Sequence, residues 1–95
     1  MVIGICHVEF LIHESCSLKS KRRVLKKIIA NIQNRYNISV AEVGSNDLWQ
    51  RGEIGIAVVG NDKAHLNSLL DKALNYIETL GLAEVIDHSI EFFNS

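Results

Sequence analysis

The order in which hydrophobic periodicities follow one another is the feature that most limits the folds open to this chain. An alternating pattern changes to a helical one, returns for two segments, becomes helical again and ends in alternation. The expected elements are a strand over 2–13, a helix over 18–35, strands over 38–44 and 53–60, a helix between 62 and 81, and a strand over 83–93.

Local signals mark the ends of both helices. Ser17 and Asp62 stand where an N-cap side chain would accept a backbone N–H, and Gly81 stands where a helix ends in a left-handed turn. In the first helix, the apolar positions fall on one face together with Lys21, whose stem is expected to follow the core edge while its charge reaches water.

The order of strands and helices, together with the rule that crossovers are right-handed, predicts an α+β fold, the ferredoxin-like βαββαβ plait. Four antiparallel strands would form one sheet, with both helices on one face, in a single domain over residues 1–95. The other face would stay open. Its apolar side chains, in a position to pair two copies into a homodimer, are expected to be Ile3, Ile5, Leu11, Ala57 and Val59.

Composition points to a cytoplasmic globular protein. Hydrophobic residues make up 47% of the chain, but no apolar run is long enough to cross a bilayer. The apolar N-terminus has no basic leader or small-residue cleavage site, so it is interpreted as a strand. Two cysteines, Cys6 and Cys16, have neither redox-motif nor disulfide-scaffold spacing, and both are expected to be reduced.

Charge is distributed unevenly. Six of the ten basic residues lie between positions 19 and 27, where no acidic residue occurs, although the net charge of the whole chain is −1. An ordinary solvated helix face mixes signs, and cations near a helix N-terminus are disfavoured by its dipole. Contact with RNA or another polyanion is therefore predicted for Lys19, Lys21, Arg22, Arg23, Lys26 and Lys27.

A second candidate contact lies in the loop over 45–52. The side chains of Asp47, Trp49, Gln50 and Arg51 would suit base stacking or a partner anchor. The alternative, which we favour from the sequence, is that Trp49 folds back over one end of the core, while Arg51 pairs with Asp47 or Glu53.

Three blocks in register resemble the YlxP-like proteins, a bacterial family of unknown function. They are SLKSKRRVLK over 17–26, NISVAEV over 37–43, and DLWQR over 47–51 followed by GIAVV over 55–59. The resemblance implies a ferredoxin-like fold and, from genes that often neighbour translation and ribosome-maturation factors, a role near RNA or the ribosome. At one position the chain departs from the family, since Ser20 replaces a frequent acidic residue and removes a capping-box partner of Ser17.

No catalytic or cofactor motif is evident, so we expect a binding module and not an enzyme. No metal site is predicted either, because His7, Glu9 and His13 share one side of a strand but His88 would point to the other face. Cys16, just before a cationic helix, is the one residue to watch for reactivity. Two hypotheses stay open: RNA or ribonucleoprotein binding, and a homodimeric module that meets an acidic protein partner.

Overall fold

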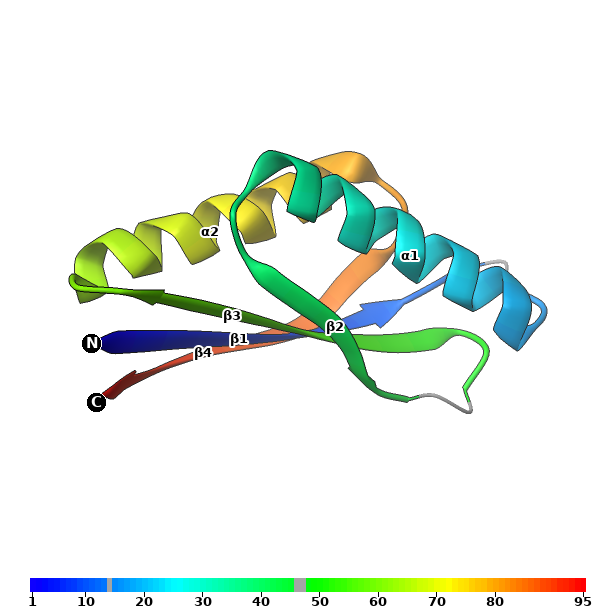
Figure 1. The fold of residues 1–95 in the computed structure, drawn as a ribbon. Helices are drawn as coiled ribbons and strands as arrows, with labels where there is room; N and C mark the ends of the chain where they lie inside the picture. The colour runs from blue at the N-terminus through cyan, green and yellow to red at the C-terminus, as the bar shows by residue number, and fades with distance from the viewer. Residues whose placement is uncertain (14, 46–47) are drawn as a thin grey trace.

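The computed structural model describes residues 1–13, 15–45 and 48–95, and it has the predicted element order. The six elements are β1 (Val2–Leu11), α1 (Leu18–Arg35), β2 (Ser39–Gly44), β3 (Arg51–Gly60), α2 (Lys63–Leu80) and β4 (Glu84–Asn94). The strands form one antiparallel sheet in the order β2-β3-β1-β4, and both helices cover one face of it (Figure 1). This confirms the ferredoxin-like α+β fold.

The core lies between the sheet and the helices. Alternate residues of β1 and β3, such as Phe10 and Ile56, point toward α1 and α2 and are almost inaccessible to solvent. The helices contribute the apolar faces expected from their periodicity, for example Ile28 of α1 and Leu70 of α2. Burial of these side chains is the main stabilising term of the fold, since each contributes about 1.5–3 kcal/mol.

The helix caps form as predicted. The hydroxyl of Ser17 accepts a hydrogen bond from the backbone N–H of Ser20 at 3.1 Å, and the carboxylate of Asp62 accepts one from Ala64 N–H at 3.0 Å. The hydroxyl of Ser20 also donates a hydrogen bond to the Ser17 carbonyl. The start of α1 is therefore stabilised by hydrogen bonds although no acidic capping-box partner is present. Gly81 ends α2 with φ of +64°, a backbone conformation that side chains rarely adopt.

The strands differ from the prediction at their ends, and β4 has one irregularity. β1 ends at Leu11 and β3 begins at Arg51, each two residues earlier than expected, because Leu11 and Arg51 are the last residues that pair between these strands. In β4, the register against β1 shifts between Glu9 and Phe10, which leaves Ile86 as the extra residue of a bulge. Val85 therefore packs against the core, and Ile86 is 37% exposed.

The chain ends meet at one end of the sheet. Met1 and Ser95 exchange hydrogen bonds of 2.8 and 3.0 Å, and Figure 1 shows both termini beside each other. The opposite end holds the start of α1 and the β2–β3 connection (Figure 1). The molecule is elongated, with extents of 43 × 22 × 19 Å, so these two ends are far apart.

Candidate functional site

Five of the six predicted cations form an exposed row on the outer face of α1, which we call the basic stripe. Four of them surround a shallow hollow of about 450 Å³. None of the five forms an ion pair with any residue in the described ranges, so their charge faces solvent unneutralised. The basic stripe consists of Lys19, Arg22, Arg23, Lys26 and Lys27.

Lys21 does not belong to this surface, and the prediction that its charge reaches water is wrong. Its side chain is 0% exposed, and its ammonium donates a hydrogen bond of 2.6 Å to the carbonyl oxygen of Ser45. The Glu42 carboxylate lies 3.7 Å away and compensates the buried charge. Position 21 is on the core face of α1, so the stem of the lysine leads toward the end of β2 and not toward solvent.

Lys21 instead helps to attach the β2–β3 connection to the beginning of α1. Two further hydrogen bonds join the same parts: Gln50 Nε2 donates to the Ser15 carbonyl at 3.4 Å, and Ile12 N–H donates to the Gln50 carbonyl at 2.8 Å. These bonds hold the connection next to the N-terminal end of the basic stripe. Its backbone is attached at Ser45 by Lys21 and at Gln50 by Ile12.

Trp49 lies on this connection and is not folded over the core. Its side chain is 55% exposed and that of Leu48 is 49% exposed, so the favoured core-covering interpretation is wrong. The core end beneath the connection is already closed by the buried side chains of Lys21 and Leu25. Residues 48–51, which we call the aromatic loop, line a surface hollow of about 430 Å³.

Arg51 was predicted to pair with Asp47 or Glu53. No ion pair joins Arg51 to Glu53 in the part of the chain that the structure describes. Asp47, the other predicted partner, lies outside the described residues. Arg51 is exposed and, together with Trp49, gives the aromatic loop a cation beside an indole ring.

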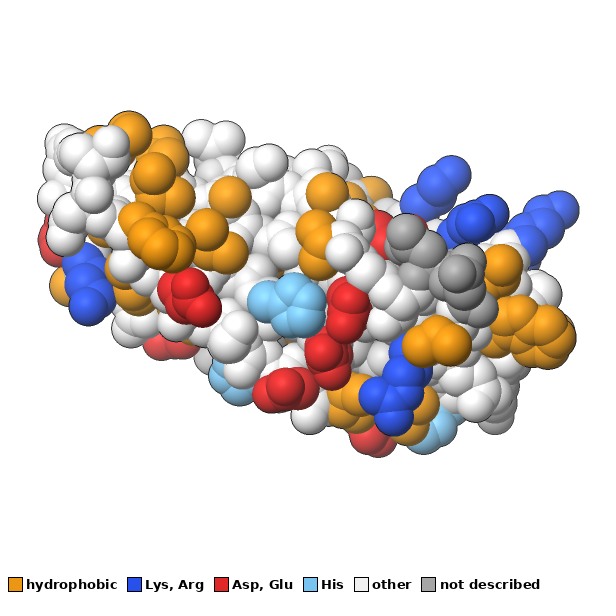
Figure 2. Space-filling model, turned by 90° about the horizontal axis from the view of Figure 1, so that it is seen from below, with side chains coloured by type: hydrophobic (Ala, Val, Ile, Leu, Met, Phe, Trp, Pro, Cys, Tyr) orange, Lys and Arg blue, Asp and Glu red, His pale blue; other side chains and the backbone are white. Residues whose placement is uncertain are grey.

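The open face of the sheet is apolar at the end where the termini meet. Val59, Ile3 and Phe93 form one row across three strands, and Ala57 and Ile5 lie in the next row. Val59 is 66% exposed, Phe93 48% and Ile5 40%. In Figure 2, hydrophobic side chains gather at this end of the face, while several Lys and Arg side chains project at the other. We call these five residues the apolar end.

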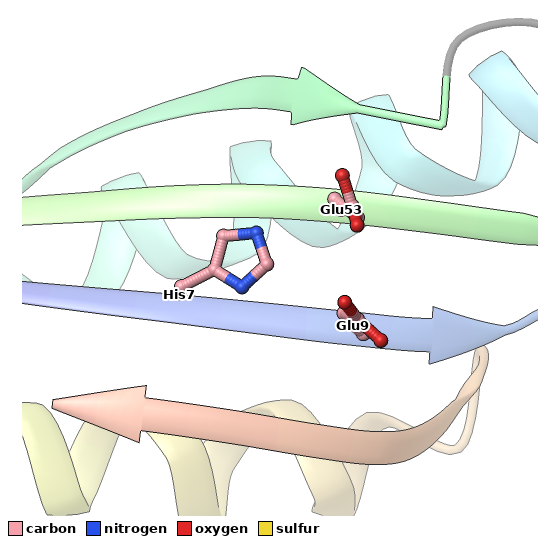
Figure 3. Close-up of side chains that lie close together, drawn as sticks. All are labelled: His7, Glu9 and Glu53. Carbon is pink, nitrogen blue, oxygen red and sulfur yellow. The ribbon is translucent and has the colours of Figure 1, made fainter.

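The middle of the same face is acidic around a histidine. Glu9 lies directly opposite Glu53 in the β1–β3 register and opposite Asp87 in the β1–β4 register. His7, Glu9 and Glu53 each present one ligand atom, and all three atoms lie within 4.8 Å of one another. Figure 3 shows the imidazole of His7 between β1 and β3, with Glu9 over β1 and Glu53 over β3, and we call these three residues the His–Glu cluster.

The sequence pattern had not brought these three residues together. It grouped His7 and Glu9 with His13, but His13 lies beyond β1 and pairs with Glu84 at 3.3 Å. His88 pairs with the buried Val8 and so lies on the helix-covered side of the sheet, as expected. Glu53 was missed because only the β1–β3 register decides which residue of β3 stands beside Glu9.

The two cysteines have different environments. Cys6 is inaccessible in the core, and its burial, together with the negative charge of Asp71, raises the pKa of its thiol from about 9 to about 11. Cys16 is exposed just before α1, and both thiols are free. Cys6 therefore behaves as a small apolar side chain, and Cys16 is the accessible thiol.

The helices of the described segments do not include a candidate for crossing a lipid bilayer.

Comparison with known proteins yields a family and a fold. The family model described as "Protein of unknown function (DUF503)" matches residues 3–90. The uncharacterised protein YlxP of Bacillus subtilis is 38% identical over 78 residues, which cover 82% of this chain and 85% of YlxP.

Solved structures with a similar fold are distant in sequence. The designed protein Foldit4 has a TM-score of 0.53 at 14% identity and covers 99% of this chain and 97% of its own. A putative antibiotic biosynthesis monooxygenase from Deinococcus radiodurans has a TM-score of 0.53 at 17% identity, with 100% and 92% covered. The cofactor-independent oxygenase SnoaB from Streptomyces nogalater has a TM-score of 0.51 at 11% identity, with 99% and 92% covered. At these identities the likeness extends to the fold alone.

Proposed function

Because the chain belongs to the DUF503 family of proteins of unknown function, its activity has to be inferred from its own surface, and we propose that it binds RNA through the basic stripe and the aromatic loop. The RNA would be free or part of a ribonucleoprotein. The proposal is of a binding module, with no catalytic residue assigned.

The unneutralised basic stripe is the observation that carries this proposal. A cation in the first turn of a helix, such as Lys19, opposes the helix dipole, and five cations side by side on one helix face repel one another. Folding stability therefore gives no reason for the arrangement. A row of phosphates would neutralise several of these charges at once and release counterions, which favours binding.

The aromatic loop adds the second element that single-stranded RNA would use. An exposed indole offers a flat surface on which a base can stack, and the guanidinium of Arg51 can meet a phosphate. The hydrogen bonds from Lys21 and Gln50 hold this loop beside the stripe, so stacking and phosphate contact would occur on one end of the molecule.

The open face of the sheet is a poor alternative surface for RNA. Its middle row carries Glu9, Glu53 and Asp87, whose charges would repel phosphates. With a net charge of −1 the whole chain does not attract polyanions in bulk, so any binding has to use a local surface. The basic stripe and the aromatic loop form such a surface.

The test is binding of the purified protein to ribosomal RNA fragments at several salt concentrations. The variant changes Arg22, Arg23 and Lys26 to Gln, and the matched control changes the three cations Arg35, Lys63 and Lys72 to Gln. We expect the wild type and the control to bind, with affinity falling steeply with salt, and the stripe variant to lose about two units of the log–log salt slope.

Two results would overturn the proposal. Equal losses in the stripe variant and the control would show diffuse attraction, and absence of RNA binding at low salt would remove the function itself. Salt-dependent binding of an acidic protein, without RNA binding, would support the alternative of an acidic protein partner at the same stripe.

A second candidate function, homodimer formation, is favoured by the exposure of the apolar end. A sheet face carrying Val59, Ile3 and Phe93 in one row is usually a contact surface. The acidic middle row would repel its own copy, so the two apolar ends would overlap and give an elongated dimer. Sedimentation equilibrium should then show a dimer that Phe93→Ser dissociates, while a monomer at millimolar concentration would exclude it.

A further inference from the structure

The His–Glu cluster is separate from the surface proposed for RNA, because it lies on the open face of the sheet at its centre. Its three side chains come from two neighbouring strands, whose backbones are fixed by the sheet on both sides. One imidazole nitrogen and two carboxylate oxygens lie within 4.8 Å of one another (Figure 3). This combination of donor atoms is one that divalent transition metals accept.

The facing carboxylates form no ion pair with any of the described residues. Glu9 and Glu53 are direct cross-strand neighbours, an arrangement of like charges that destabilises a sheet. Asp87 extends the row on the other side of Glu9, which increases the repulsion. The two ion pairs in the described part of the chain join other residues, so no lysine or arginine there lies within ion-pair distance of the cluster, although Arg51 lines a surface hollow together with Glu9 and Glu53.

The backbone around the cluster makes room for its side chains. A Cβ at Gly44 would overlap the carboxylate oxygen Oε2 of Glu53, so this carboxylate lies directly against the glycine backbone. His7 stands directly opposite Gly55, where the side chain of Val43 covers the backbone at 3.0 Å from a Cβ position. The His–Glu cluster thus lies against the backbone of Gly44 and Gly55, with the side chain of Val43 beside it on β2.

We propose that His7, Glu9 and Glu53 bind one divalent first-row transition-metal ion, with Zn²⁺ as the representative. Metal–ligand distances of about 2.0–2.2 Å place ligand atoms roughly 3.4 Å apart in a tetrahedral site, so ligand atoms up to 4.8 Å apart have to approach one another by up to about 1.4 Å. Rotation about the glutamate χ angles supplies this movement. The ion would neutralise the facing carboxylates and leave at least one coordination position for water or a bound ligand.

The experiment is titration of the full chain, freed of metal by chelation, with Co²⁺ by visible absorption and with Zn²⁺ by calorimetry. We expect one site per chain and a d–d spectrum typical of low coordination number. His7→Gln, Glu9→Gln and Glu53→Gln should each weaken binding at least tenfold. The matched controls are Glu91→Gln, an acid on the same face opposite Ile5, and His88→Gln on the other face; both should bind as the wild type does.

Three outcomes would overturn the inference. Equal weakening by Glu53→Gln and Glu91→Gln would indicate diffuse attraction of cations to the acidic face. Unchanged affinity in His7→Gln would show that the imidazole is not a ligand, and Mg²⁺ binding as tight as Zn²⁺ binding would indicate the same. Because the stripe variant keeps the cluster, it should bind Co²⁺ normally whether or not the protein binds RNA, so the two proposals succeed or fail independently.

Discussion

Lys21 Nζ donates a hydrogen bond of 2.6 Å to the carbonyl oxygen of Ser45, and this contact joins the first helix to the connection that carries the aromatic loop. Lys21, the cation on the core face of α1, thus connects two segments that are 24 residues apart in the sequence. The five cations of the basic stripe remain exposed to solvent or ligands. The basic residues of α1 therefore serve two purposes, one structural and one at the surface.

The first prediction concerns the hydrogen bond between Lys21 and Ser45. Lys21→Met should lower the free energy of unfolding by about 1–3 kcal/mol, because the Ser45 carbonyl loses its donor and the partly buried Glu42 carboxylate loses its counter-charge. Urea denaturation measures the difference. The control, Lys19→Met on the exposed side, should change stability by less than about 0.5 kcal/mol. Equal small effects of both substitutions would show that the buried contact contributes nothing.

The second prediction concerns the cross-strand acids. In the presence of a chelator, Glu53→Gln should raise the free energy of unfolding by about 0.5–1 kcal/mol, since it removes a like-charge pair with Glu9. Glu91→Gln, whose cross-strand neighbour is Ile5, is the control with the same change of charge. With Zn²⁺ added, the order should reverse, because the wild type would gain stability from the bound ion. A destabilised Glu53→Gln protein without metal would contradict the argument.

The third prediction follows from the buried thiol. The pKa of Cys6 is about 9 ordinarily and about 11 in the folded protein, so between these pH values the unfolded chain has lost a proton that the folded chain keeps. Stability should consequently fall as pH rises from 9 to 11, by up to about 1.4 kcal/mol per pH unit from this group. The difference between wild type and Cys6→Ala in thermal unfolding isolates it from lysine and tyrosine titration.

Labelling with a thiol reagent gives a second readout of the same difference. In the folded protein at neutral pH, Cys16 should react and Cys6 should not, because only Cys16 is exposed. Reaction of both thiols at the same rate would contradict the described core. A Cys16 that reacts no faster than a free thiol would end the idea of special reactivity at the start of α1.

The fourth prediction concerns the aromatic loop. Trp49→Ala should weaken single-stranded RNA binding by about 1–3 kcal/mol, the usual contribution of one stacked base. Its free energy of unfolding should change by less than about 0.5 kcal/mol, because the indole is 55% exposed and does not cover the core. Quenching of the single tryptophan fluorescence on RNA addition gives a direct measurement. A large loss of stability with unchanged RNA affinity would restore the core-covering interpretation.

The sequence by itself determined the order of the elements, the caps of both helices and the faces that form the core. These features depend on residues close together in the chain. Ser17 caps α1 by accepting the N–H of Ser20, three residues further along, and the apolar positions of α1 repeat every three to four residues. Separation of the basic residues from the acidic ones was equally visible, because it is a property of the linear order.

Only the tertiary structure decided which side chains meet across elements. The bulge at Ile86, the position of Glu53 beside Glu9, and the burial of Lys21 against Ser45 all depend on strand register and helix placement. A shift of one residue in register moves every side chain of a strand to the other face, and periodicity alone does not fix that register. The basic stripe was therefore predictable from sequence, whereas the His–Glu cluster was not.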